Sequence, residues 1–178
     1  NKKIFVSTTE VTFTDGNGGA GAGVEQTLFS ITIPGGTLGT NNGVRFKMYI
    51  SGIDMAQGAA AYTFRVKYGA ATQLTLTNGS SPNDMVTTQG NLGGYFEGYI
   101  LADGSASVQK ITGVIDLAQN DGENAADTAV GFSKHHMHGT AAGAISSASD
   151  QTLAITLQQT NNAANDCVVE WCVIESIR

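Results

Sequence analysis

Three histidines lie within the six residues KHHMHG, at His135, His136 and His138, and the chain has no others. In an extended strand the side chains at i and i+2 share one face, so His136 and His138 could bind one metal ion together. A structural zinc site needs four ligands and a catalytic site needs three, and neither cysteine is close in sequence. Asp150 or a neighbouring subunit could complete a metal or anion site. We favour the interpretation that the three histidines are polar surface residues at the rim of the protein, and we expect no bound cofactor.

The acidic segment LAQNDGENAADT is a second candidate metal site, with Asp121, Glu123 and Asp127. Such carboxylates can bind calcium, or can act as an acid and base pair in glycoside hydrolysis. The spacing lacks the regular D-x-[DN]-x-[DN]-G pattern of a calcium loop, which favours solvated loop carboxylates. No Ser-His-Asp, Cys-His or phosphate-loop arrangement has motif support in the sequence. We therefore expect a protein that is not an enzyme.

Aromatic side chains form a third kind of candidate site, because their ring faces can stack on apolar faces of a ligand such as a sugar. Tyr95 and Tyr99 lie four residues apart in GYFEGYIL and therefore share one face of an expected strand. These two tyrosines are the candidate glycan-binding residues. The single tryptophan, Trp171, lies in the apolar run CVVEWCVIES and is expected in the core.

The overall composition narrows the classes of partner. The 178 residues carry a formal net charge of −6, and charged residues make up 13% of the chain, about half the usual share. The nine Lys and Arg residues are scattered and form no basic stripe, which argues against nucleic acid as a partner. No apolar run approaches the roughly 20 residues of a membrane span, so no membrane partner is expected.

Short alternating runs between clusters of Gly, Asn, Ser and Asp predict β-strands, and no long run has the period of a helix. The expected strands are 4–13, 25–33, 44–51, 62–68, 71–77, 94–101, 106–116, 128–134, 151–158 and 167–177. The segments YGAAT and LADGSA, the latter with Asp103-Gly104, predict hairpins. We expect a jelly-roll-like antiparallel β-sandwich of about eight to ten strands, with 1–178 as one domain.

Residues 14–24 are expected to form a flexible Gly-rich loop within that domain. The loop contains Gly16-x-Gly18-x-x-Gly21, which formally matches the dinucleotide-binding fingerprint. That fingerprint requires a helix after the glycines, whereas the run that follows here predicts a strand. No dinucleotide cofactor is expected.

The stretch EQTLFSITIPGGTLGTNNGVRFKMYISG, followed by FRVKYGAATQLTLTNGS and GYFEGYILADGSASVQKITG, resembles a recurring arrangement in bacteriophage virion structural proteins. There an LFS-x-x-IPGG-x-LG segment precedes a strand pair with KYG and a hairpin with ILADG. The resemblance covers roughly residues 25–115 and consists of turn glycines and strand hydrophobics. It implies a jelly roll, often trimeric, that decorates a capsid or forms a fibre, spike or tail-tip domain, and it implies no catalytic residues.

Two functions are compatible with these observations. The first is a non-enzymatic structural protein of a phage virion, either a capsid decoration or a fibre or tail-tip protein, assembled in the host cytoplasm. It would self-associate, with a homotrimer favoured, and attach to other virion proteins, with a host surface glycan as a further candidate partner. The alternative is an extracellular carbohydrate-binding β-sandwich module, with calcium as a candidate ion.

Overall fold

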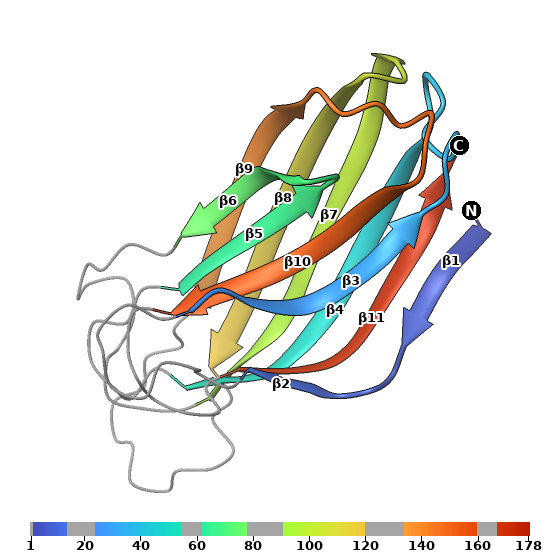
Figure 1. The fold of residues 1–178 in the computed structure, drawn as a ribbon. Helices are drawn as coiled ribbons and strands as arrows, with labels where there is room; N and C mark the ends of the chain where they lie inside the picture. The colour runs from blue at the N-terminus through green and yellow to red at the C-terminus, as the bar shows by residue number, and fades with distance from the viewer. Residues whose placement is uncertain (1, 14–23, 55–61, 78–90, 120–133, 160–166) are drawn as a thin grey trace, which may run out of the picture.

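The computed structural model describes residues 2–13, 24–54, 62–77, 91–119, 134–159 and 167–178. Within these ranges eleven strands form two antiparallel sheets that pack face to face (Figure 1), which confirms the predicted all-β sandwich. The strands are β1 (Lys2–Ser7), β2 (Val11–Phe13), β3 (Gln26–Ile33), β4 (Gly43–Asp54), β5 (Tyr62–Tyr68), β6 (Ala71–Thr77), β7 (Asn91–Ser105), β8 (Val108–Gln119), β9 (Lys134–Gly143), β10 (Gln151–Gln159) and β11 (Cys167–Ile177). The described residues contain no helix long and apolar enough to cross a membrane.

The larger sheet has seven strands in the order β1-β11-β4-β7-β8-β9, with β2 also paired to β11. The smaller sheet has the order β3-β10-β5-β6. Strands β3, β4 and β5 alternate between the two sheets, and so do β9, β10 and β11, which gives a jelly-roll-like connectivity. The two ends of the chain meet at one edge of the larger sheet, where β1 pairs with β11 (Figure 1).

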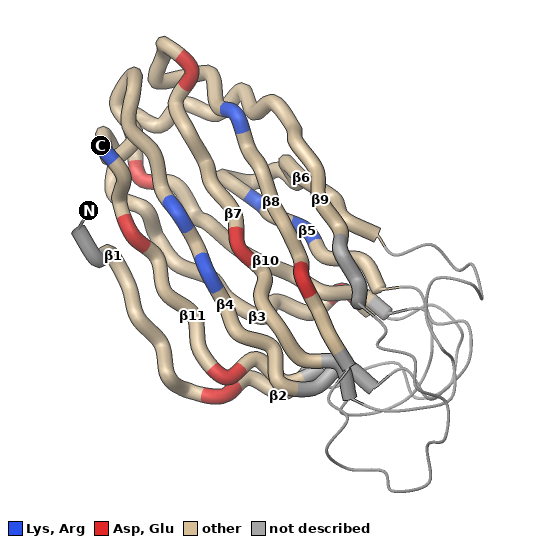
Figure 2. Tube along the Cα trace, turned by 180° about the vertical axis from the view of Figure 1, so that it is seen from behind, with Lys and Arg blue, Asp and Glu red and all other residues tan. Residues whose placement is uncertain are grey.

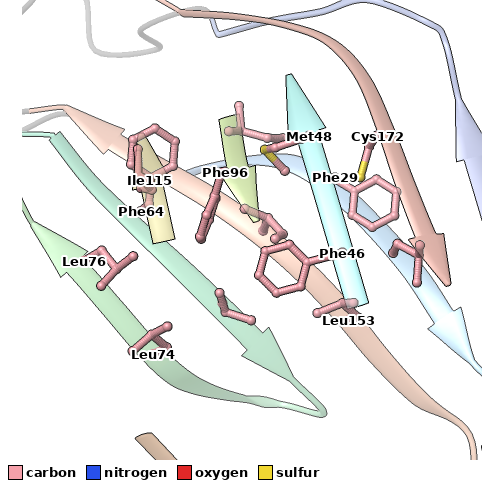
Figure 3. Packing of buried hydrophobic residues seen from close by; sticks show 14 of the residues in the cluster. Phe29, Phe46, Met48, Phe64, Leu74, Leu76, Phe96, Ile115, Leu153 and Cys172 are labelled. Carbon is pink, nitrogen blue, oxygen red and sulfur yellow. The ribbon is translucent and has the colours of Figure 1, made fainter. Parts of the chain in front are cut away.

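The core fills the space between the sheets and follows from the period-two alternation of their strands. Every second side chain of β5 is buried, and so is every second side chain of β4 between positions 44 and 50, as the sequence predicts. The ring of Phe96 on β7 makes edge contacts with Phe46 on β4, at 5.2 Å between centroids, and with Phe64 on β5, at 5.6 Å. These rings join the two sheets at the centre of the core (Figure 3).

A row of three glycines crosses β7, β8 and β9, and two of them face the leucines of β6. Gly98, Gly113 and Gly139 are direct cross-strand partners on β7, β8 and β9. A Cβ added at Gly113 or Gly139 would lie 2.9 or 2.7 Å from a leucine side chain of β6. A Cβ added at Gly98 would lie 2.4 Å from the backbone oxygen of Thr112. The leucines of β6 therefore occupy space that only glycine leaves open in the larger sheet.

Two predicted strands differ from the structure by more than a shift of their ends. The run 4–13 divides into β1 and β2, which accounts for eleven strands where about eight to ten were expected. Of the run 128–134 only Lys134 is described, and it begins β9, which continues to Gly143. The loop 14–24 lies outside the described residues, except for the exposed Val24.

Both predicted hairpins are present, but one turn lies at a different position. Strands β5 and β6 are joined at residues 69–70, where Gly69 has a φ of +67°, as YGAAT predicts. Strands β7 and β8 are joined at residues 106–107, so the predicted turn at Asp103-Gly104 is wrong. These two residues instead lie where the register of β7 shifts, and Gly104 adopts a φ of +72° there. The left-handed conformation that favours glycine serves a bulge rather than the turn.

We expect the substitution Gly98→Ala to destabilise the fold by about 1–3 kcal/mol, the usual cost of overpacking a core. The new methyl group would collide with a backbone oxygen, which cannot move without disturbing the pairing of β7 with β8. Urea unfolding followed by circular dichroism measures the change. The control Val114→Thr changes an exposed residue of β8 and should shift stability by no more than about 0.5 kcal/mol. Equal stability of Gly98→Ala and the parent chain would contradict this packing.

Candidate functional site

Three aromatic side chains lie side by side on the outer face of the seven-stranded sheet. Tyr49 on β4 is the direct cross-strand partner of Trp171 on β11 and of Tyr95 on β7. The residues that follow Tyr49 and Tyr95, Ile50 and Phe96, are fully buried, so alternation directs the two tyrosines outward. We call Tyr49, Tyr95 and Trp171 the aromatic cluster.

The rings of the aromatic cluster form a compact triangle. Their centroids are 5.2 Å apart for Tyr49 and Tyr95, 6.2 Å for Tyr49 and Trp171, and 6.1 Å for Tyr95 and Trp171. The rings of Tyr49 and Trp171 are within 18° of parallel, and the ring of Tyr95 is tilted from both. Because these distances lie in the range where aromatic rings attract one another, the cluster holds its shape without a ligand. Tyr95 is 42% exposed.

The predicted core position of Trp171 is wrong, and a β-bulge in β11 is the reason. Val169 and Cys172 are both buried, although a regular strand buries residues an even number of positions apart. The pairing of β11 with β4 passes from Val169 to Trp171 and skips Glu170. Since a bulge re-aims the side chain that follows it, Trp171 lies partly exposed on the outer face.

Charged side chains border the aromatic cluster on the same face. Glu97 on β7 accepts one hydrogen bond from Arg45 Nε, at 3.0 Å, and another from the Tyr99 hydroxyl, at 2.9 Å. Lys47 Nζ lies 4.0 Å from Glu97 Oε2 and 4.2 Å from the ring centroid of Tyr95, in a cation–π contact. Figure 2 shows the basic residues of β4 beside the acidic residue of β7. The face thus presents hydrogen-bond donors and acceptors next to exposed rings.

The hydrogen bonds of Glu97 keep its carboxyl ionised. Burial raises the pKa of Glu97, but the hydrogen bonds from Arg45 and Tyr99 and the charges of Arg45 and Lys47 together outweigh burial, so the pKa is lower than usual. The hydrogen bond to Glu97 also raises the pKa of Tyr99 and that of Arg45. The side chain of Glu97 remains 26% exposed. A carboxylate acceptor is therefore open to a ligand beside Tyr95.

The two tyrosines predicted to bind a glycan occupy the same face but make different contacts. Tyr95 belongs to the aromatic cluster, whereas Tyr99 belongs to the hydrogen-bond network of Glu97, which lies between them on β7. Tyr49 is not among the residues that the sequence singles out, and Trp171 is expected in the core. Alternation within β4 does place Tyr49 on the outer face, but its pairing with neighbouring strands cannot be derived from one strand alone. The role of Tyr95 and Tyr99 in glycan binding stays a prediction.

The described part of the chain does not test the predicted metal ligands, because the side chains of His135 and His136 lie outside it. His135, His136 and His138 lie in β9, where the backbone of His136 pairs with that of Asp116 and the side chain of His138 is exposed. No group of three or more His, Cys, Asp or Glu residues suited to a metal ion occurs among the described residues. The other metal candidates, Asp121 and Glu123, lie outside the described residues. All four metal ligands, His136, His138, Asp121 and Glu123, stay predictions.

A second charged network lies on the outer face of the four-stranded sheet and has a structural role. Glu25 accepts a hydrogen bond from the Thr156 hydroxyl, and its carboxylate lies 2.6 Å from Lys67 Nζ and 3.7 Å from Arg65 Nη1. Burial raises the pKa of Glu25, but the hydrogen bonds with Lys67 and Thr156 and the charges of Lys67 and Arg65 together outweigh burial, so the pKa lies below its usual value. Glu25 thus links the start of β3 to β5 and β10.

Comparison with known proteins identifies no family, because no family model and no curated protein matches the chain. The fold is similar to the CBM2 module of the Lactobacillus casei BL23 phage J-1 evolved Dit, with a TM-score of 0.41 and 12% identity over 99% of this chain and 95% of that module. It is also similar to the alginate lyase from Klebsiella pneumoniae, with a TM-score of 0.28 and 9% identity over 78% of this chain and 60% of the lyase. At these TM-scores neither likeness bears on the function of this chain.

Acidification should destabilise the protein through Glu25 and Glu97. Because both pKa values are lowered by folding, the two carboxylates contribute stability above their usual pKa of 4.5. That contribution is lost as the pH falls through the folded-state values. Urea midpoints measured from about pH 6 to about pH 3 should therefore decrease, and Glu97→Gln should make the decrease smaller. The control Asp103→Asn removes an exposed pair with Lys110 and should leave the decrease unchanged. An unchanged decrease in Glu97→Gln would contradict the account.

Proposed function

We propose that this protein is a non-catalytic attachment module of a phage virion and that it binds a host surface glycan through the aromatic cluster. The observation that carries the binding function is the mutual contact of Tyr49, Tyr95 and Trp171 on an outer sheet face. Outer faces of antiparallel sheets usually carry polar side chains. Clustered apolar residues on such a surface are typical of a binding site.

The chemistry of this face suits a sugar. The face of an aromatic ring is negative, and the C–H groups on one face of a pyranose are weakly positive, so the two stack. The hydroxyl groups around the sugar need hydrogen-bond partners at the edge of the stacked ring. Glu97 supplies an acceptor there, and Lys47 and Arg45 supply donors.

The virion setting is supported by the resemblance over residues 25–115. Its IPGG-x-LG, KYG and ILADG motifs contain Gly36, Gly39, Gly69 and Gly104, whose φ values lie between +53° and +78°. Only glycine adopts this conformation without strain, so the shared motifs specify the turns and bulges of a shared sandwich. The place of the protein in a virion, as capsid decoration, fibre or tail tip, belongs to the proposal.

A carbohydrate-binding module of an extracellular protein is the second candidate function, because the aromatic cluster would serve it equally well. The two candidates differ in assembly. A virion component is expected to self-associate, with a homotrimer favoured, whereas a binding module is expected to be a monomer. Subunit number therefore separates the two candidates even if both bind the same glycan.

We expect Tyr95→Ala and Tyr49→Ala each to weaken binding to any glycan recognised on an array by at least about tenfold, or about 1.4 kcal/mol. Each substitution removes one of the three aromatic rings on which the sugar would stack. Trp171 is the only tryptophan of the chain, so its fluorescence measures binding directly. The control Lys110→Ala changes an exposed residue of the same sheet and should bind as the parent does. Unchanged affinity in both tyrosine variants, with folding verified by circular dichroism, would refute the proposed site.

Native mass spectrometry with and without EDTA tests the assembly and the histidine cluster together. We expect a metal-free trimer or larger assembly that adds glycan without changing its subunit number. A monomer would contradict the virion proposal and favour the extracellular module. An assembly that carries metal and dissociates in EDTA would instead assign His136, His138 or the Asp121 segment to an interface between subunits.

A further inference from the structure

We infer that the aromatic cluster accepts one uncharged sugar unit, at the end or at a branch of a glycan, rather than a run of stacked sugars or an acidic sugar. This inference rests on the proposed function and names the ligand class of the same site. Its grounds are the spacing of the rings, the charges around them and the position of Glu97 Oε2 beside Lys47.

The spacing of the rings limits how much of a glycan can stack. Trp171 and Tyr95 are separated by two strand spacings, which amount to about 9–10 Å in a sheet. Their ring centroids are nevertheless only 6.1 Å apart, so the two side chains lean toward each other over Tyr49. A polysaccharide that lies across a sheet needs several aromatic side chains spaced along the length of the polysaccharide. Three rings gathered in one triangle offer the area of a single sugar ring.

The charges around the cluster disfavour an acidic ligand. Asp116 is the cross-strand partner of Tyr95, and Glu175 is the cross-strand partner of Arg45, whose pKa it helps to raise. Glu97 and Glu175 therefore lie beside the two cations Arg45 and Lys47, and both cations already face Glu97. The chain as a whole carries a net charge of −6. A carboxylate or sulfate on the sugar would meet repulsion, whereas an uncharged sugar would not.

One oxygen of Glu97 is placed to orient the stacked sugar. Both hydrogen bonds of this carboxylate reach Oε1, from Arg45 and from Tyr99. Oε2 faces Lys47 Nζ at 4.0 Å, which is longer than a hydrogen bond. A sugar hydroxyl placed beside Tyr95 would bind Oε2 and bring Lys47 within reach of a neighbouring hydroxyl. The acceptor and donor occupy one side of the triangle, which again fits a single sugar unit.

The test uses Trp171 fluorescence with glucose, galactose and N-acetylglucosamine oligosaccharides of one to six units, and with glucuronate and galacturonate counterparts. We expect affinity to change by less than about threefold beyond the disaccharide, and the acidic counterparts to bind at least about tenfold more weakly at low salt. The variant Glu175→Gln removes a carboxylate beside Arg45 and should narrow the difference in affinity between neutral and acidic sugars. The variant Glu97→Gln should weaken the binding of neutral sugars, and the affinity should still be independent of oligosaccharide length beyond the disaccharide.

Three other outcomes would overturn the inference, and they separate it from the proposed function. Affinity that keeps rising up to the hexasaccharide and is lost in Tyr95→Ala would refute the single-unit ligand but retain the glycan site. Preferential binding of the acidic sugars, also lost in Tyr95→Ala, would refute the uncharged ligand and retain the site. Absence of binding to every sugar would refute the proposed function together with the inference.

Discussion

The β-bulge at Glu170 determines which side chains of β11 enter the core, and the candidate site depends on it. Side chains of a strand alternate between two faces, so a shift of one residue exchanges the faces. Without the bulge, the phase set by buried Val169 would carry Trp171 into the core and turn Cys172 outward. With the bulge, Cys172 packs inside, where burial raises the pKa of its thiol to about 12 and leaves it unreactive. The register of β11 after the bulge therefore determines both which residues enter the core and which form the aromatic cluster.

The same strands that form the core also carry the outer face on which the aromatic cluster lies. On β7, Phe96 joins the two sheets from the inside, while Tyr95 and Glu97 on either side of it point outward. The backbone of paired central strands loses little freedom when a ligand binds, because pairing and packing already hold it in place. The hydrogen bonds of Glu97 to Arg45 and Tyr99 fix the polar part of the face in the same way. The face is thus arranged before any ligand arrives.

The alternation of apolar residues was enough to predict the sandwich and the inward faces of β4 and β5, because burial and side-chain period are both local properties of a strand. The hairpin between β7 and β8 was predicted, but its turn was not, since Gly104 serves a bulge that depends on the register of two strands. Trp171 was misplaced for the same reason. Tyr95 was found from its own strand, but its contacts with Tyr49 and Trp171 join segments far apart in sequence.

The turn glycines of this protein indicate its fold, whereas the outward-facing residues of the larger sheet indicate its function. The motifs that resemble those of phage virion proteins contain glycines with positive φ, such as Gly36 and Gly69, and turns of this kind strongly favour glycine. Such motifs follow the fold, and one fold supports many functions. The outward residues of β4, β7 and β11 are not required by the fold, because polar side chains would satisfy the same strands. The presence of three contacting aromatic rings there is therefore the stronger evidence for binding.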